Sequence, residues 1–347
     1  MVFLPEEISR LDTLLSCGGP VCITTHTHPD GDALGSAYAI LHYLRENRGL
    51  DARVVINDRW PACLDFMVDE ADMGLTLIRE TGPEEADAAI RDCALIVCTD
   101  FNAPSRIDGL EQAFRSSGAR KLLIDHHLSP DRELFDLVFS DAEVSSASEL
   151  AMALLEALPD VGGDLSRLSV RTLTLLMTGI TTDTNNFANS VYPSTLSACS
   201  GLIAAGVDRD WILDRLYRSY SEERVRATAR FTADYMRVTP QGAAYIIIDE
   251  DVFNSFGLVQ GDTEGLVNVP LGIGRVCLSI LLRQEGGQYR VSVRSKAGVS
   301  ANAFAIKYFE GGGHERASGG KLRIGPTVKD SADAEKYVRR CIEDFFE

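Results

Sequence analysis

The placement of histidine is the feature of this sequence that most clearly indicates chemistry. Five of the six histidines fall in three short segments, THTHPDGD at 25–32, DHH at 125–127 and GGGHERASGG at 311–320. The first two segments are also rich in aspartate, and two further aspartates, Asp100 and Asp183, follow apolar runs. Mixed sets of histidine and aspartate suit Mn²⁺, Fe²⁺ or Mg²⁺ rather than the thiolate-bound zinc of structural sites. The pattern therefore predicts a divalent metal centre.

The spacing H-x-x-x-D-x-D in the first segment suits a pair of ions. A loop that leaves a strand can direct His26 and Asp30 toward one cation while Asp32 faces a second. Carboxylates gathered at strand ends repel one another and resist desolvation unless cations lie among them. Two ions about 3.5–4 Å apart can share a hydroxide and hold both the attacking and the leaving oxygen at phosphorus. The predicted chemistry is two-metal hydrolysis of a phosphate ester.

Each of these segments also has a simpler interpretation. Pro29, Asp30 and Gly31 are turn residues, and a lone DHH could be a solvated loop. Asp100 and Asp183, taken singly, are more typical of helix caps or turns. The segments occur together, however, and three of the four acidic segments directly follow apolar, strand-like runs. This co-occurrence favours the metal centre.

The glycine segment has two interpretations as well. Gly311, Gly312 and Gly313 could end a helix and begin a flexible linker. The segment lies, however, inside the basic stretch 271–325, which has nine Lys or Arg against three acidic residues. Consecutive glycines let backbone N–H groups approach a phosphate closely, and His314 can donate to an oxyanion. We therefore expect this segment to bind the substrate.

The elements that must position the aspartates are strands of a parallel sheet. Short, β-branched apolar runs at 21–25, 53–56, 94–99 and 121–125 alternate with helical patterns such as 33–47. Continuous apolar runs that alternate with helices indicate βαβ units, in which helices cover both faces of a mostly parallel sheet. Ligands of such sheets bind beyond the carboxyl ends of the strands. Three of the runs end in potential metal ligands, which agrees with this architecture.

The second half of the chain is predicted to begin with a helical region and to continue with a region of both strands and helices. From about 145 to 236 the apolar spacing is that of helices, and 240–242 is a Pro-Gln-Gly turn. We place the boundary near 237–243, with a catalytic metal-binding domain at 1–237 and a smaller α/β substrate-binding domain at 243–347. The active site is expected in the cleft between them. In the second domain we expect strands at 276–282 and 289–295, a helix at 301–309 and a terminal helix from 331.

Composition limits the class of partner. The chain has 347 residues, 45% of them hydrophobic, which suits two domains with sizeable cores. Its formal charge of −17 argues against binding of long duplex nucleic acid, because proteins that do so neutralise many phosphates. The short basic stretch instead suits a small anionic ligand. Scattered cysteines, an acidic N-terminus and the lack of an apolar run long enough to span a membrane favour a soluble cytoplasmic protein.

Four N-terminal segments resemble the motifs of the DHH phosphoesterase superfamily. They are, in order, THTHPDGDALGS, VCTDFNAPSR, LIDHH and TGITTDT. The C-terminal segment VRSKAGVSANAFAIKYFEGGGHERASGG is similar to the DHH-associated domain, with its R-S, N-x-x-A and G-G-G-H-x-x-A-x-G elements. The resemblance covers nearly the whole chain and is strongest for the stand-alone nanoRNase A group. It implies hydrolysis of short oligoribonucleotides and removal of the 3′-phosphate from 3′-phosphoadenosine 5′-phosphate (pAp).

The resemblance also implies a set of metal ligands. His26 and Asp30 would bind one ion, and Asp32 and His126 the second, with Asp100 bridging the two. Mn²⁺ is the expected metal of both sites, with Mg²⁺ and Fe²⁺ as alternatives. The complete set of expected metal ligands is His26, Asp30, Asp32, Asp100, His126 and Asp183.

Further residues are expected, on the same resemblance, to contact the substrate. His127 would reach toward the scissile phosphate, Asp125 would orient the histidine pair, and Arg106 would hold phosphate. Ser318 stands where alanine is usual in the family, and Phe187 could either stack a base or belong to the core. The expected substrate-binding residues are Arg294, Ser295, Asn302, Gly311, Gly312, Gly313, His314, Ser318 and Gly319.

The expected partners are short single-stranded RNA or DNA fragments, linear dinucleotides and pAp, with no membrane and no long duplex. The oligomeric state stays open, and a homodimer is one alternative. Two other functions remain in view, a nucleotide-binding regulator without catalysis and an exopolyphosphatase- or pyrophosphatase-type hydrolase of the same superfamily. A cyclic-dinucleotide phosphodiesterase would use the same chemistry, but the membrane and sensor segments usual in that group are not found.

Overall fold

The computed structural model describes residues 3–16, 18–313, 315–325 and 328–347. The chain divides into two compact units, Met1–Arg218 and Ser219–Glu347. The first unit contains a parallel sheet with helices, and the second contains a separate mixed sheet with its own apolar core. The predicted fold class, a parallel α/β sheet followed by a smaller α/β unit, is confirmed.

The first unit is built on a six-stranded sheet in which all neighbouring strands are parallel. In chain order the strands are β1 (Val21–Thr24), β2 (Ala52–Ile56), β3 (Thr76–Ile78), β4 (Leu95–Thr99), β5 (Arg120–Asp125) and β6 (Leu137–Ser140). Their order in the sheet is β3-β2-β1-β4-β5-β6, so the direction of winding reverses between β1 and β4. Open α/β sheets bind ligands at this reversal, beyond the carboxyl ends of the strands. The four central strands were predicted, whereas the short edge strands β3 and β6 were not.

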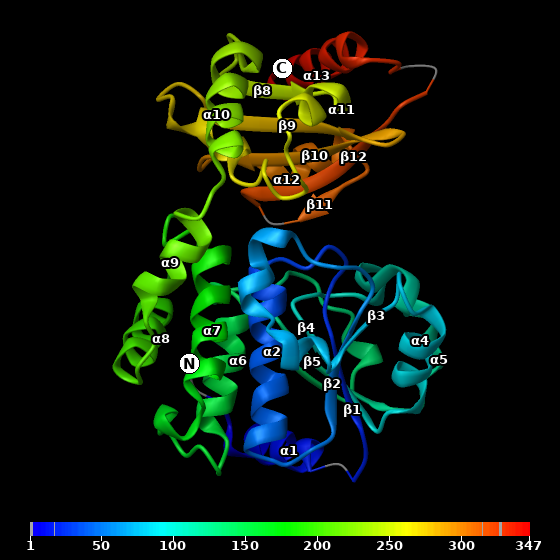
Figure 1. The fold of residues 1–347 in the computed structure, drawn as a ribbon, viewed down its shortest axis with the longest axis vertical. Helices are drawn as coiled ribbons and strands as arrows, with labels where there is room; N and C mark the ends of the chain where they lie inside the picture. The colour runs from blue at the N-terminus through cyan, green and yellow to red at the C-terminus, as the bar shows by residue number, and fades with distance from the viewer. Residues whose placement is uncertain (1–2, 17, 314, 326–327) are drawn as a thin grey trace. The chain divides into compact units, whose positions relative to one another are not determined.

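Helices cover both faces of this sheet (Figure 1). The helices of this unit are α1 (Pro5–Leu15), α2 (Gly31–Glu46), α3 (Glu70–Met73), α4 (Pro83–Asp92), α5 (Glu111–Ser116), α6 (Ala147–Ala157), α7 (Val170–Asp183), α8 (Pro193–Ala204) and α9 (Arg209–Tyr217). Side chains alternate across a strand, so Val21 and Ile23 of β1 enter the core shared with α2, α6 and α7, whereas Cys22 enters the core shared with α4 and α5. The 3₁₀ segments of this unit are η1 (Ala62–Met67), η2 (Pro104–Leu110), η3 (Arg132–Leu134) and η4 (Leu165–Arg167).

Glycines at the contact between α2 and α7 let these two helices pack closely. A Cβ atom on Gly35 of α2 would lie 2.7 Å from the carbonyl oxygen of Leu175 in α7. A Cβ atom on Gly179 of α7 would lie 2.9 Å from Oδ1 of Asp32. Both separations are shorter than ordinary van der Waals contacts, so any side chain at these positions would push the helices apart. The first turn of α2 is therefore held against the last turns of α7.

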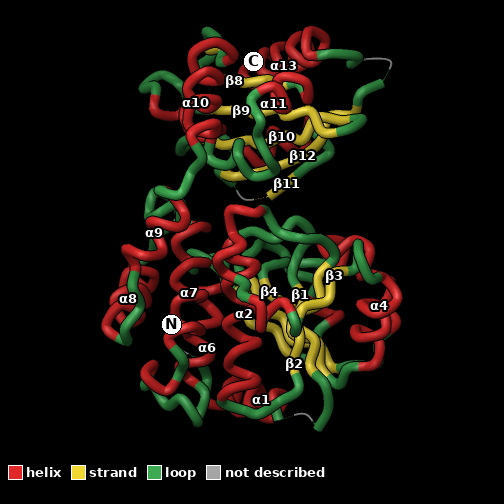
Figure 2. Tube along the Cα trace, viewed as in Figure 1, coloured by secondary structure: helices red, strands yellow, loops and turns green. Residues whose placement is uncertain are grey.

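The second unit has a mixed sheet with helices on both faces (Figure 2). Its strands are β7 (Arg237–Val238), β8 (Ala243–Ile248), β9 (Leu278–Glu285), β10 (Gln288–Ser295), β11 (Gly312–Gly313) and β12 (Ala317–Arg323), in the order β11-β12-β10-β9-β8-β7. Only β8 and β9 pair in parallel among the described pairs. Its helical segments are α10 (Glu222–Arg230), η5 (Phe231–Tyr235), α11 (Glu250–Ser255), η6 (Leu266–Gly272), α12 (Ala301–Tyr308) and α13 (Ser331–Phe346).

The division between the units falls after Arg218, earlier in the chain than the boundary expected near 237–243. The reason is the packing of α10, whose Ala227 shares an apolar core with Phe231 and with Ile246 of β8. Helical periodicity alone did not indicate on which sheet this helix packs. Among the described helices, none combines the length and the apolar character needed to cross a membrane.

Candidate metal centre

Three neighbouring strands bring the candidate ligands to one edge of the first sheet. His26 follows β1, Asp100 directly follows β4, and Asp125 ends β5 and is followed by His126 and His127. The pairing of β1 with β4 and of β4 with β5 continues to these strand ends. Because the carboxyl ends of parallel strands meet at the same edge, side chains far apart in sequence are brought together.

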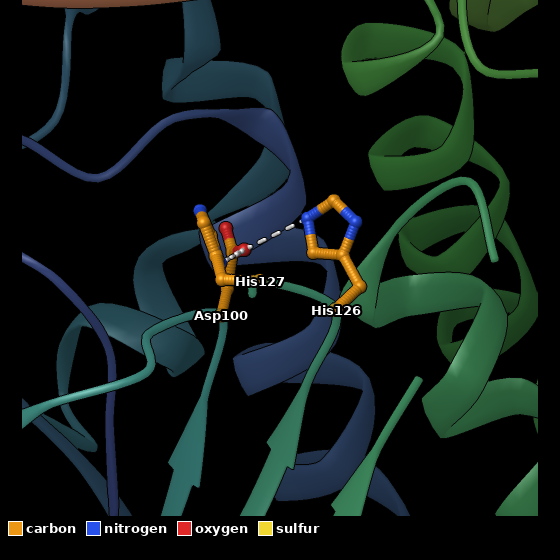
Figure 3. Close-up of side chains that lie close together, drawn as sticks. All are labelled: Asp100, His126 and His127. Carbon is orange, nitrogen blue, oxygen red and sulfur yellow. Dashed lines mark ion pairs between the residues drawn. The ribbon is translucent and has the colours of Figure 1, made fainter. Parts of the chain in front are cut away.

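Asp100 lies at the centre of this group (Figure 3). Its Oδ2 is 3.4 Å from Nε2 of His26, and its Oδ1 is 3.4 Å from Nε2 of His126 and 3.7 Å from Nδ1 of His127. The backbone at Asp100 has a φ of +61°, a value that residues with a side chain rarely adopt outside functional or turn positions. The buried carboxylate therefore faces three imidazole rings.

A second set of potential ligands adjoins the first through His126. Nε2 of His126 lies 3.6 Å from Oδ2 of Asp183, the last residue of α7, and 3.8 Å from Oδ2 of Asp32 in the first turn of α2. The close packing of these two helices places the two carboxylates together. Three groups of residues place potential ligand atoms within 4.8 Å of one another. The first group is His26, Asp30 and Asp100, and the second is Asp32, His126 and Asp183. A third, Asp100, His126 and His127, joins these two.

Asp30 has a structural role in addition to its place in the first group. Its Oδ1 accepts hydrogen bonds from the backbone N–H groups of Asp32 at 3.0 Å and Ala33 at 3.1 Å, which makes Asp30 the N-cap of α2. The simpler interpretation of this residue, a cap or turn, thus describes part of its role. It leaves the metal role open, because a carboxylate has about four lone pairs and capping uses only one oxygen.

The Asp32 carboxylate is held by the N-terminus of α6. Its Oδ2 accepts from the backbone N–H of Ala147 at 2.7 Å, and its Oδ1 accepts from the backbone N–H of Ser148 at 2.9 Å. The exposed N–H groups of a helix N-terminus favour a negative charge at this point. Asp32 is 1% exposed, so these bonds stabilise a carboxylate that has lost nearly all contact with water.

Three aspartates that are buried or partly buried lie close together in these groups, and their negative charges would be stabilised by positive charge. Burial raises the pKa of Asp32 well above its ordinary value, and the nearby Asp100 and Asp183 raise it further. Burial likewise raises the pKa of Asp183 to about 7. Although burial opposes ionisation of Asp100, the His126 and His26 rings hold its pKa well below the usual range. Carboxylates crowded in this way are stabilised by cations placed among them.

The residues expected to act on the phosphate adjoin the same strand ends. Nδ1 of His127 lies 2.8 Å from Oδ1 of Asp125, which is fully buried, so the carboxylate fixes the orientation of this ring. Arg106 lies in η2 with an exposed side chain, and its carbonyl oxygen accepts from the N–H of Thr27 at 2.8 Å. Arg106 therefore adjoins the loop that carries His26.

Asp58, which belongs to none of the four motifs, also contacts this loop. It follows β2, is 3% exposed, and its Oδ2 lies 2.6 Å from Nδ1 of His28 and accepts from the backbone N–H of His28 at 2.7 Å. His28 has a φ of +54° and stands between the candidate ligands His26 and Asp30 in the chain. An aspartate after the strand-like run RVVI was the signal that could have revealed it.

In the second unit, the expected glycine segment forms the edge of the sheet. Gly312 pairs with Gly319, and Gly313 pairs with Ser318, between β11 and β12. Arg294 of β10 lies on the other side of β12, with Nη1 3.4 Å from the carbonyl oxygen of Ser318. These expected substrate-binding residues are thus brought together, and their role in binding remains a prediction.

The remaining residues that were expected to bind the substrate differ in their surroundings. A Cβ atom on Gly311 would collide with the carbonyl oxygen of Gly319, so only glycine fits there. Oδ1 of Asn302 is buried, and no hydrogen-bond partner for it is found among the described residues. The hydroxyl of Ser295 donates to Val299 O at 2.6 Å within its own loop. His314 lies outside the described residues.

Phe187 is packed against the core of the first unit, and the Arg209 guanidinium lies 5.1 Å from the centre of its ring. Of the two alternatives for this residue, the core aromatic is the one with packing contacts in the structure.

The donor set fits a pair of divalent cations of the manganese or magnesium type. Each of the two groups offers one imidazole and two carboxylates, and no cysteine belongs to either group among the described residues. Nitrogen and oxygen donors of this kind suit Mn²⁺, Fe²⁺ or Mg²⁺, whereas thiolates select zinc or copper. Either group could hold a divalent cation, and Asp100 and His126 lie where the two groups meet.

Comparison with known proteins agrees with this geometry. The sequence profile of the DHH family, N-terminal domain, matches residues 20–180, which include the first three motifs and only the first three residues of the fourth. The bifunctional oligoribonuclease and PAP phosphatase NrnA of Thermus thermophilus is 30% identical over 321 residues, 90% of this chain and 87% of that protein. A crystal structure of an exopolyphosphatase-related protein from Bacteroides fragilis is 31% identical, with a TM-score of 0.89 over 99% of this chain and 98% of that chain.

A further relative has a different activity in its name. The cyclic-di-AMP phosphodiesterase GdpP of Geobacillus thermodenitrificans is 28% identical over 343 residues, which cover 97% of this chain. They cover 49% of GdpP, so the chain spans about half the length of that relative.

Proposed function

The chain belongs to the DHH family, and on this premise we propose that it is a two-metal phosphoesterase of short oligoribonucleotides and linear dinucleotides that also dephosphorylates pAp. The similarity to NrnA proteins over 90% of the chain supports this choice of substrates. The two ligand groups at the reversal of the first sheet support the choice of chemistry.

The proposed metal ligands are the two groups that the strand ends and helix ends bring together. His26, Asp30 and Asp100 would hold one ion, and Asp32, His126 and Asp183 the other. Bound divalent ions, with Mn²⁺ the expected metal, would act as Lewis acids that offset the negative charge of the phosphoryl oxygens.

The protein's own residues would orient the phosphate and stabilise its charge. With Nδ1 of His127 held by Asp125, the opposite edge of the ring is directed away from that carboxylate and can donate to a phosphate oxygen. Arg106 would add a fixed positive charge beside the His26 loop. Such donors are most effective when they are positioned before the substrate arrives, because no reorganisation is then needed during the reaction.

The second unit would bind the nucleotide that carries the phosphate. Arg294 supplies charge, and the glycines of β11 and β12 let a phosphate approach backbone N–H groups that a side chain would shield. Asn302 offers a buried amide whose oxygen can accept a hydrogen bond. Sites for a few nucleotides, rather than a long groove, agree with the overall charge of −17.

One observation carries the proposal above all others. The two oxygens of the Asp100 carboxylate lie equally far, 3.4 Å, from ring nitrogens of His26 and His126, which come from two other strands. The carboxylate of Asp100 would therefore be able to offer one oxygen to each of two ions, which supports its proposed role as the ligand that they share.

The test is a product time course with pApA, a five-nucleotide RNA and pAp, each with and without Mn²⁺ after chelation. The proposal expects mononucleotides from the first two substrates and release of phosphate from pAp, all dependent on the metal. A nucleotide-binding regulator would bind these ligands and release no product. Hydrolysis of polyphosphate or pyrophosphate alone would instead assign the chain to the inorganic substrates of the superfamily.

Cyclic di-AMP is a second candidate substrate because of the similarity to GdpP over 97% of the chain. Opening of this ring would be the same kind of phosphodiester hydrolysis, with the same residues as proposed metal ligands. Including cyclic di-AMP in the time course separates the two candidates: conversion to pApA faster than cleavage of pApA would favour the cyclic substrate.

A further inference from the structure

Glu149 is a buried carboxylate outside the expected ligand set. It lies in the first turn of α6 and is 2% exposed. Its Oε2 accepts three hydrogen bonds, from the backbone N–H of Ser145 at 3.0 Å, the hydroxyl of Ser145 at 2.6 Å and the hydroxyl of Thr195 at 2.7 Å. Burial of a carboxylate is costly, and stability alone would be served as well by an apolar side chain.

The three bonds fix the segment that leads into α6. Ser146, between Ser145 and the helix, caps α6 by accepting from the backbone N–H of Glu149 at 3.0 Å. Glu149 thus restrains Ser145 with its side chain and Ser146 with its backbone. Thr195, in turn, lies in the first turn of α8, so the segment is also tied to a second helix.

The next two residues of the chain are the ones that hold Asp32. The backbone N–H groups of Ala147 and Ser148 donate to the two oxygens of the Asp32 carboxylate at 2.7 and 2.9 Å. Each oxygen keeps a second lone pair for another partner. The position of the Asp32 oxygens is therefore set by the position of the N-terminus of α6.

We propose that Glu149 is a positioning residue of the metal centre: it fixes segment 145–148, and through that segment the carboxylate of Asp32. The inference rests on the proposed function, since it assumes that Asp32 is a ligand. The proposed role predicts an effect on the binding of only one of the two ions. Removal of Glu149 should weaken the ion held by Asp32, His126 and Asp183 and spare the ion held by His26, Asp30 and Asp100.

Loss of overall stability would have a different signature, because it would affect both ions alike. The two ions can be measured separately in two backgrounds. Asp30→Asn keeps the N-cap of α2 while removing a charged ligand of the first group, and Asp183→Asn removes a charged ligand of the second group. Binding of Mn²⁺ is then followed by the electron paramagnetic resonance of the free ion, which needs no turnover.

In the Asp30→Asn background, Glu149→Ala should weaken Mn²⁺ binding by roughly 10–100-fold, as loss of a partner behind a metal ligand does elsewhere. In the Asp183→Asn background the same change should leave Mn²⁺ binding within about twofold of its starting value. Glu149→Gln is the conservative variant, because Oε1 has no hydrogen-bond partner among the described residues and the amide oxygen can take the place of Oε2. In the Asp30→Asn background, Glu149→Gln should keep the affinity for Mn²⁺ within about threefold of the value measured with Glu149 unchanged.

The control for general destabilisation is Asp72→Asn. Asp72 is buried, lies 2.7 Å from Nη2 of Arg171 and 3.0 Å from Nε2 of His42, and belongs to neither ligand group. It should lower the unfolding temperature and leave Mn²⁺ binding unchanged in both backgrounds. If Glu149→Ala does not fold, Thr195→Val removes one of the three bonds with little change of shape and should weaken the same ion selectively.

Equal weakening of both ions, or no weakening of the ion in the Asp30→Asn background, would overturn the role of Glu149 and leave the proposed function standing. If the unchanged protein shows no saturable Mn²⁺ binding at all, the proposed function fails first, and the inference fails with it.

Discussion

Oδ1 of Asp100 lies 3.4 Å from Nε2 of His126, although the two residues follow different strands and no local element joins them. The pairing of β4 with β5 in parallel makes this contact, and the pairing of β4 with β1 brings His26 to the other oxygen of the same carboxylate. The sheet thus gathers donors for two cations at the point where its winding reverses.

Replacement of Asp100 by alanine should abolish hydrolysis while leaving the fold intact. The variant removes the oxygens that face both His26 and His126, and kcat for pApA should fall by about 10²-fold or more. Turnover near that of the unchanged protein would refute the bridging role.

Asp58→Ala should weaken the ion of the first group. The carboxylate accepts from the backbone N–H of His28 and fixes the loop between His26 and Asp30, so Mn²⁺ binding should weaken roughly tenfold. His28→Ala is the matched variant, since it removes the ring and keeps the backbone bond at 2.7 Å. Its effect on Mn²⁺ binding should be clearly smaller. Equal effects of the two variants would place the role in the ring of His28 instead.

Gly179→Ala should destabilise the protein by about 1–3 kcal/mol, because the added methyl group would collide with the side chain of Ser148 in α6 and lie 2.9 Å from Oδ1 of Asp32 in α2. Gly201→Ala in α8 is the matched control. There the nearest atom, Cδ1 of Leu165, is 3.4 Å from the added methyl group, and the higher helix propensity of alanine should leave stability unchanged or raised. Urea unfolding of both variants measures the difference, and a similar response of the two would contradict the close packing of α7 against α6 and α2.

The His42 imidazole should make stability depend on pH. Although burial opposes its protonation, Asp72 and Glu46 hold the pKa of His42 above its ordinary value of 6.5. The contribution is therefore complete below about pH 6.5 and is lost as the pH rises through the higher pKa of the folded protein. His42→Gln should lower the free energy of unfolding by about 1 kcal/mol at pH 6 and by less at pH 9. A cost that does not change with pH would contradict the ion pair with Asp72.

Arg294→Ala should raise KM for pAp by roughly tenfold with a smaller change in kcat, since a charged hydrogen bond to bound phosphate would be lost. Lys307→Ala is the control from the same basic stretch, because the Lys307 ammonium already pairs with Asp344 at 2.8 Å. It should leave KM nearly unchanged. An unchanged KM for Arg294→Ala would remove this residue from the proposed nucleotide site.

The sequence predicted the strands that precede the candidate metal ligands because β1 and β4 are fully buried and the last four residues of β5 are buried as well. β1 and β4 are continuous apolar runs, and an aspartate or histidine after such a run stands out. The edge strands β3 and β6 have three and four residues and are only partly buried, so they lack that pattern. The candidate ligands that follow these strands could thus be predicted from local sequence.

The supports of the site were not predictable in the same way. Asp32 is held by amides of Ala147 and Ser148, which lie more than a hundred positions further along the chain. Asp58 acts on the loop of His26 from the end of a neighbouring strand, and its place after the run RVVI was its only local signal. Such contacts depend on how α6 and β2 pack, which periodicity does not specify.

The most direct test of the central claim is a crystal structure of the protein soaked in Mn²⁺, with anomalous scattering measured at the manganese edge. The account predicts two peaks, one among His26, Asp30 and Asp100 and one among Asp32, His126 and Asp183. No peak at these side chains, or peaks only elsewhere on the protein, would contradict it.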